Sequence, residues 1–206
     1  MTTTAMERPL GASVRAKGDA PLETPTVVEA PEPAEVREVK PKEFLIIDYS
    51  GDLEKVWATM ILASTSAAMG VRTRVFVTFW GLPAFVREER RITGQNWMQK
   101  LMSAMQRPGI SHRKLSRMDF FGMGPWMMRK LARQYGVASP KELLEAAQLL
   151  GVEFIPCQMT MDMFGLRPED LIDEMGEPAG AATAIEIMTE ADASLYLHPQ
   201  TLARLA

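Results

Sequence analysis

The chain has a single cysteine, Cys157, among its 206 residues. It directly follows an apolar run that ends at Pro156, and the residues after it have the pattern of a short helix or a tight loop. Open α/β folds hold their reactive groups in the crevice at the carboxyl ends of the strands, so this position favours a functional thiol. Amide N–H groups at the start of a helix would favour the thiolate and lower the pKa of the thiol.

A thiolate without a second cysteine cannot be resolved into an internal disulfide, so any sulfur chemistry at Cys157 must finish on another molecule. The simplest such chemistry is to accept a sulfur atom and to pass it on. Free cysteine is also among the residue types most often buried, and a thiol that only packs in the core is therefore the alternative interpretation.

A second group of polar residues follows the first apolar run of the chain, where it would meet the cysteine at one edge of a sheet. We interpret this turn as part of a pocket whose charged side chains tune the thiol, and a plain helix start is the alternative. A hydroxyl three residues after the cysteine is a further candidate. The pocket candidates are Ser50, Gly51, Asp52, Lys55 and Thr160.

Metal and cofactor sites are not expected. Cys157, Met159, Met161 and Met163 are soft ligands that could hold Cu(I), but in a helix Met161 would turn away from the other methionines. Zinc is disfavoured because the chain contains only two histidines. The sequence has neither a complete dinucleotide-binding glycine motif nor a Gly-x-Ser-x-Gly nucleophile elbow, so no cofactor is predicted.

The elements that would position the cysteine alternate between strand and helix. The helix before the cysteine-bearing strand has a strong start signal, with Ser139 at the N-cap, Pro140 at the first helical position and Glu142 at the third. The pattern predicts a mostly parallel, doubly wound α/β sheet with helices on both faces. The expected strands are residues 44–49, 71–79, 152–155 and 194–197, and the expected helices are residues 53–68, 140–150, 168–174 and 178–190.

A segment at about residues 80–135 departs from this pattern and is long for a connection. Amphipathic helices are expected at 95–106 and 125–135, with an irregular stretch between them. Residues 87–133 carry a net charge of about +8, whereas the chain beyond them carries about −9. A basic, methionine-rich insert fits a lid or an oligomer contact on the protein's own acidic half, an acidic protein partner, or peripheral contact with an anionic membrane surface.

Composition limits the classes of protein that remain. Residues 1–42 are rich in proline and glutamate and lack aromatic residues, so we expect a disordered tail followed by one α/β domain at 43–206. The formal net charge of −3 argues against a nucleic-acid-binding protein. A single cysteine and the absence of a long apolar run predict a cytoplasmic protein.

Residues 44 to about 198 resemble the DsrE/DsrF/DsrH-like sulfur-relay family, and within it the second DsrE-type branch. The resemblance implies an α/β fold that forms homo-oligomers, a persulfide carried on Cys157, and partners that are relay proteins of the rhodanese and TusA types. Some members have a second cysteine or a membrane segment, and this sequence has neither. The landmarks are Ser50-Gly51-Asp52 with Lys55, Ala67-Ala68-Met69-Gly70, the segments 76–82, 115–118 and 122–124, and the segment 157–165.

Residues and resemblance together predict a sulfur carrier or sulfurtransferase-type protein that holds a persulfide on Cys157 and exchanges it with partner thiols. One alternative is a one-cysteine thiol peroxidase or reductase that uses an outside thiol, although no Thr-x-x-Cys or Cys-x-x-Cys pattern is present. Another alternative is a non-catalytic α/β binding module.

Overall fold

The computed structural model describes residues 42–90 and 93–197. Apart from Lys42, the tail expected at residues 1–42 lies outside the described residues.

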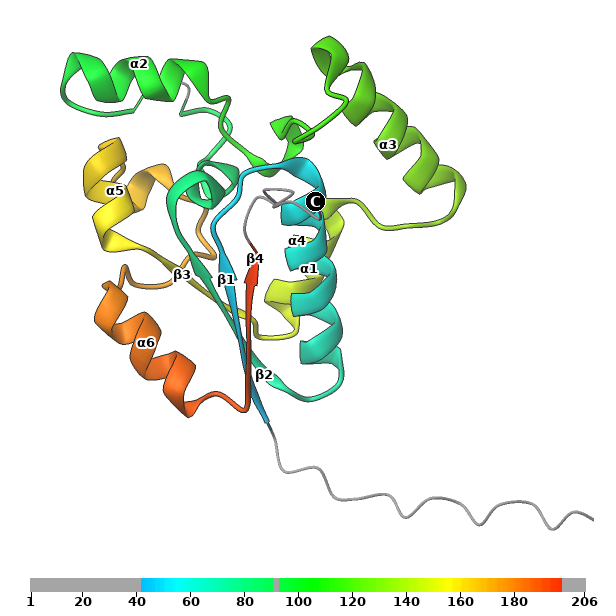
Figure 1. The fold of residues 1–206 in the computed structure, drawn as a ribbon, viewed down its shortest axis with the longest axis vertical. Helices are drawn as coiled ribbons and strands as arrows, with labels where there is room; N and C mark the ends of the chain where they lie inside the picture. The colour runs from blue at the N-terminus through cyan, green and yellow to red at the C-terminus, as the bar shows by residue number, and fades with distance from the viewer. Residues whose placement is uncertain (1–41, 91–92, 198–206) are drawn as a thin grey trace, which may run out of the picture. The chain divides into compact units, whose positions relative to one another are not determined.

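Four parallel strands form the sheet, in the spatial order β3-β2-β1-β4 (Figure 1). Asp48 pairs with Val77 on the neighbouring strand, and Val77 pairs with Pro156 on the next, so the carboxyl ends of three strands lie at one edge. The expected parallel α/β sheet is confirmed. The strands are β1 (Glu43–Asp48), β2 (Arg72–Val77), β3 (Glu153–Pro156) and β4 (Ala193–Leu197).

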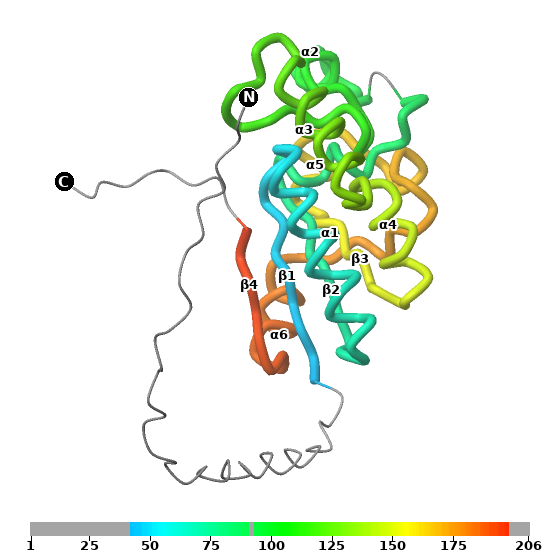
Figure 2. Tube along the Cα trace, turned by 90° about the vertical axis from the view of Figure 1, so that its right-hand side faces the viewer, coloured from blue at the N-terminus to red at the C-terminus, as the bar shows by residue number. Residues whose placement is uncertain are grey.

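Helices cover both faces of the sheet (Figures 1 and 2). On one face, α1 (Leu53–Ala68) packs against α4 (Pro140–Leu149) over a core built from alternate strand residues such as Ile46, Val75 and Val77. The intervening strand residues point to the opposite face, where α6 (Ala181–Glu190) packs. This alternation follows from the two-residue period of a strand, and it explains why the strands are apolar throughout.

The predicted start of α4 is confirmed in atomic detail. The Ser139 side chain accepts a hydrogen bond from the backbone N–H of Glu142, and the Glu142 carboxylate accepts one from the N–H of Ser139. This reciprocal pair satisfies two amide groups that the first turn of a helix leaves without partners. The helix ends before Gly151, which has a φ of 78°.

Three expected boundaries were wrong, each because backbone groups pair elsewhere. The strand expected at 71–79 ends at Val77, because the chain then forms the 3-10 helix Phe79–Phe85. The helix expected at 168–174 is only a 3-10 turn at Pro168–Asp170, since Ile172 donates its N–H to the carbonyl of Phe85. The helix expected at 178–190 begins at Ala181, because Ala179 pairs with Cys157 as in a sheet.

The insert contains the two expected helices, α2 (Trp97–Met105) and α3 (Met123–Gln134). Both lie beyond the carboxyl ends of the strands (Figures 1 and 2). The stretch between them is irregular as expected, with 3-10 turns at Ile110–His112 and Phe120–Gly122 and a positive φ at Phe121. No residue of α2 is buried, and Pro125 is the only buried residue of α3, so their apolar faces are largely uncovered by the residues that the structure describes.

Candidate functional site

Cys157 lies directly after β3 and forms the N-cap of α5 (Gln158–Phe164). Its backbone N–H donates to the carbonyl of Val77 at 2.9 Å, and its carbonyl accepts from the N–H of Met161 at 3.0 Å. A short parallel bridge to Ala179 holds the other side of the same backbone. These contacts hold the backbone at Cys157, and with it the start of the side chain, at the edge of the sheet where the sequence predicted it.

Two threonine hydroxyls surround the thiol. Thr160 is fully buried on the first turn of α5, and Thr78 is buried directly after the neighbouring strand β2. Their hydroxyl oxygens lie 3.1 Å apart, and the hydroxyl of Thr160 also accepts the N–H of Phe79 at 3.1 Å. Each hydroxyl has a single proton. A threonine that donates its proton to the sulfur of Cys157 can therefore take part in the bond between the two threonines only as the acceptor.

Hydrogen bonds decide the ionisation of the thiol. Burial raises the pKa of Cys157, but the hydroxyls of Thr160 and Thr78 and the backbone N–H groups of Thr160 and Met159 outweigh this effect, and the pKa lies below its ordinary value. Hydrogen bonds to a charged form favour that form, so the site stabilises a thiolate. A stabilised thiolate is the form that attacks sulfur and other electrophiles.

The thiol is also enclosed. Only 3% of Cys157 is exposed, and it belongs to a small apolar cluster between the sheet and α6. A partner sulfur therefore cannot reach Sγ in this conformation, and exchange requires the covering side chains to move. The cluster contains Leu45, Ile47, Phe76, Ala184 and Ile187.

The remaining pocket candidates lie around a different space. Ser50, Gly51 and Asp52 line a cavity of about 430 Å³, and neither Cys157 nor Thr160 is among its lining residues. Lys55 forms an ion pair with Asp52, with 2.6 Å between Nζ and Oδ2. Of the five candidates, the structure brings only Thr160 into contact with the thiol.

The sheet order explains this separation. Since β2 stands between β1 and β3, the ends of β1 and β3 are about 10 Å apart, twice the usual strand spacing of ~4.8 Å. The segment after β2, which begins at Thr78, fills the space between them and supplies the hydroxyl that contacts the sulfur.

Sequence reasoning missed Thr78 and Asp48. Thr78 could have been found by aligning the strand ends, since the residue before it pairs with Pro156. Asp48 is fully buried at the end of β1, and burial raises its pKa to about 7 despite hydrogen bonds from Ser50 and Thr59. Its Oδ2 has no hydrogen-bond partner within the described residues, which is the environment of a carboxyl group that is easily kept protonated.

A copper site at the methionines does not form in this arrangement. Because α5 is helical, Met161 points into the core with 1% exposure, whereas Met159 and Met163 are largely exposed. Across residues 42–90 and 93–197, no group of three or more histidine, cysteine, aspartate or glutamate side chains is arranged to hold a metal ion.

The model of the DsrE/DsrF/DrsH-like family matches residues 40–196, which is most of the chain. The chain belongs to this family. The resemblance inferred from the sequence landmarks is thereby confirmed.

The proteins similar to this chain align with it along nearly their whole length. The sulfur carrier protein DsrE2 of Allochromatium vinosum is 36% identical over 159 residues, covering 76% of this chain and 98% of the relative. The uncharacterized protein YrkE of Bacillus subtilis is 33% identical over 156 residues, covering 76% of this chain and 97% of the relative. The solved structure of the ychN protein from E. coli is 14% identical, with a TM-score of 0.47 and coverage of 75% of this chain and 98% of that one.

Among the residues that the structure describes, this DsrE-like chain also exposes many apolar side chains on its insert. Methionine and aromatic side chains on α2, on α3 and between them are exposed together with basic residues, and Lys130 stacks on Trp126. None of the described helices is long and apolar enough to cross a membrane. The exposed side chains include Trp97, Met98, Met105, Phe120, Met123, Trp126, Met127 and Leu131.

Proposed function

We propose that this DsrE-like protein is a sulfur carrier that holds a persulfide on Cys157. Family membership and a relative named as a sulfur carrier support a role in sulfur relay. The observation that carries the finer proposal is the thiol itself, which is the only cysteine of the chain and lies beside the hydroxyls of Thr160 and Thr78, polar groups that lower its pKa.

Loading is a sulfur exchange without net oxidation. The Cys157 thiolate attacks the outer sulfur of a donor persulfide, R–S–SH, and a new S–S bond forms at Cys157. The S–S bond of the donor breaks, its electron pair goes to the donor sulfur, and the donor leaves as a thiolate. An acceptor thiolate then attacks the outer sulfur on Cys157, and the Cys157 thiolate is released for another cycle.

The hydroxyls of Thr160 and Thr78 serve both halves of this cycle. They stabilise the thiolate that attacks the donor, and they stabilise the same thiolate when it becomes the leaving group. Because Cys157 is 3% exposed, loading and unloading also require a transient opening of the cluster that covers it. Enclosure between these events would protect the persulfide from unwanted thiols.

The partners in this proposal are relay proteins of the rhodanese and TusA types, and the carrier works as a homo-oligomer. The exposed methionine and aromatic surface of α2 and α3 supports a docking role, since flexible apolar side chains adapt to different partners. Peripheral contact of the same basic surface with an anionic membrane is the other use we propose for it, and co-sedimentation with anionic and neutral vesicles tests it. If the protein binds neither anionic nor neutral vesicles, the proposed membrane contact is wrong.

Intact-mass analysis tests the carrier. Wild type and Cys157→Ser are treated with polysulfide under native conditions and then with dithiothreitol. We expect wild type to gain the mass of one sulfur atom and to lose it on reduction, while Cys157→Ser stays unchanged. A parallel arm with hydrogen peroxide distinguishes the carrier from a one-cysteine thiol peroxidase. Oxygen addition with thiol-dependent turnover would indicate the peroxidase.

One outcome would contradict both chemistries. If the thiol is inert to polysulfide and peroxide in the folded protein but is alkylated after denaturation, then Cys157 only packs, and the protein is a non-catalytic binding module.

A further inference from the structure

A cavity lies at the carboxyl ends of β1 and β2, apart from the thiol. Its floor is the turn Ser50–Asp52 after β1 together with Trp80 after β2, and its other wall is the chain from the end of α2 to Lys114. The volume is about 430 Å³. In open α/β sheets this edge is where ligands bind, so the cavity is in the expected place for a ligand of its own.

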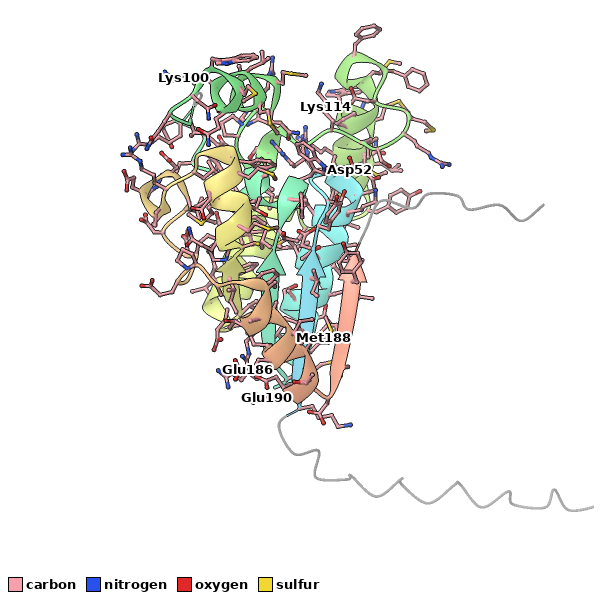
Figure 3. The ribbon with its side chains drawn as sticks, turned by 60° about the vertical axis from the view of Figure 1, so that its left-hand side comes forward. Asp52, Lys100, Lys114, Glu186, Met188 and Glu190 are labelled. Carbon is pink, nitrogen blue, oxygen red and sulfur yellow. The ribbon has the colours of Figure 1, made fainter. Side chains whose placement is uncertain are left out.

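The charges that line this cavity are unbalanced. Arg107, Arg113 and Lys114 line it, and none of the three forms an ion pair with any residue among 42–90 and 93–197. The one lining carboxylate, Asp52, already binds Lys55 at 2.6 Å and the hydroxyl of Ser50 at 2.9 Å. Figure 3 shows Lys114 and Asp52 together at this end of the sheet. The cavity therefore presents net positive charge.

Arg113 is the buried member of this set, with 5% exposure. Its Nε donates to the carbonyl of Gly109 at 3.2 Å and Nη2 donates to the carbonyl of Arg107. The other terminal nitrogen, Nη1, donates no hydrogen bond within the described part of the chain. Burial lowers the pKa of Arg113 to about 10, which leaves the guanidinium charged at neutral pH. Two neutral carbonyls hold this buried guanidinium, and Asp52 attracts it without forming an ion pair with it, so its loss of water is only partly offset.

The turn after β1 packs closely against Trp80 and Arg113. A Cβ at Gly51 would lie 2.1 Å from the carbonyl oxygen of Trp80 and 3.3 Å from Nη1 of Arg113, so only glycine lets the turn pack this closely beside the guanidinium. The same turn leads into α1, a helix of 16 residues whose N-terminal end carries partial positive charge. Asp52 and Glu54 lie at this helix end and the N–H of Leu53 donates to the carbonyl of Lys114, so the positive charge of the cavity comes from Arg107, Arg113 and Lys114.

We propose that this cavity binds a small inorganic oxyanion of the sulfate, thiosulfate and phosphate class. Arg113 binds from the buried side through Nη1, and Arg107 and Lys114 bind from the open side. Planar guanidinium groups suit oxyanions because they donate two parallel hydrogen bonds. Anion binding in this cavity does not depend on persulfide chemistry at Cys157.

Titration calorimetry at low ionic strength tests the site with phosphate, sulfate and thiosulfate in separate arms. The variants are the double substitution Arg107→Gln with Lys114→Gln, the single substitution Cys157→Ser, and the control Arg133→Gln, which removes an exposed charge on α3. We expect saturable binding to wild type, weakened about tenfold or more in the double variant, since contacts with charged groups have that magnitude. Cys157→Ser and Arg133→Gln should bind as wild type does.

Arg113→Lys tests the buried contact separately. The double variant changes only exposed side chains, so the test of anion binding does not depend on whether Arg113→Lys folds. The relative affinities of the three arms identify which oxyanion the site prefers. Absence of saturable heat in all arms would overturn the proposal. Equal weakening by Arg133→Gln would also overturn it, because it would indicate diffuse surface charge. Polysulfide loading of the double variant, which should be unchanged, keeps a failed anion site distinct from a failed sulfur carrier.

Discussion

Replacing Thr160 by valine is the most direct test of how the fold ionises its thiol. Valine has nearly the shape of threonine, so the fully buried site keeps its packing but loses the hydroxyl. The substitution removes the first hydrogen bond that favours the Cys157 thiolate, and it also removes the acceptor for the N–H of Phe79. The pKa of Cys157 should therefore rise.

The size of the effect follows from the contact that is lost. A hydrogen bond to a charged group is worth about 1.5–3 kcal/mol, so the ratio of thiolate to thiol at a given pH should fall roughly ten- to a hundredfold. The unfolding free energy should fall by about 1–3 kcal/mol, because the partly buried N–H of Phe79 is left without a partner. Loading from polysulfide should slow as well, by a smaller factor than the thiolate ratio, because a thiolate of higher pKa is the stronger nucleophile.

The assay is the ultraviolet absorbance of the thiolate as a function of pH, with Cys157→Ser as the blank. Thr160→Ser is the matched control, because serine keeps the hydroxyl and should titrate like wild type. Urea unfolding of each variant separates ionisation from stability. If Thr160→Val titrates like wild type while remaining folded, the hydroxyl does not set the ionisation of Cys157 and the reasoning fails.

Three further substitutions test the surroundings of the site. Burial raises the pKa of Asp48 to about 7, from an unfolded value of about 3.9. The protonated form therefore stabilises the fold at low pH, and this contribution is lost as pH rises through 7. Asp48→Asn should abolish a pH dependence of up to about 4 kcal/mol in the unfolding free energy between pH 4 and 8, measured with urea, whereas the exposed control Asp173→Asn should keep it. Gly51→Ala should distort the turn against the carbonyl of Trp80, seen as lower thermal stability and changed Trp fluorescence. Ser139→Ala should cost about 1 kcal/mol in the same urea assay, because the helix cap is lost, and an unchanged midpoint would contradict the cap.

Local signals in the sequence were sufficient to predict the parallel α/β sheet and the helices next to Cys157, although three element boundaries were wrong. The start of α4 was predictable because Ser139 and Glu142 bond to one another across one helical turn. The position of Cys157 at a strand end was predictable because an apolar run and a proline precede it directly. Both features depend on residues that are neighbours in the chain, and no knowledge of strand order is needed to infer them.

The composition of the site depends on strand order and on the face that each residue occupies, which the sequence does not state. Asp48 ends β1 and Cys157 directly follows β3, yet Asp48 contacts Thr59 of α1 and Cys157 packs toward α6, so their side chains lie on opposite faces of the sheet. The segments of α2 and α3 were expected to form amphipathic helices, and they do. Whether their apolar faces are exposed depends on packing partners that a hydrophobic period does not identify.

Two properties of Cys157 point in opposite directions when each is considered alone. An exposure of 3% is typical of a thiol that only packs, whereas hydrogen bonds that lower its pKa are typical of a reactive one. A packing role does not account for the second property, because an apolar cluster is better served by a neutral thiol than by donors that stabilise a charge. A carrier accounts for both, since it must hold a labile sulfur away from solvent thiols and still release a good leaving group when a partner opens the site. The donors around Sγ therefore weigh more than its burial in assigning the chemistry of this site.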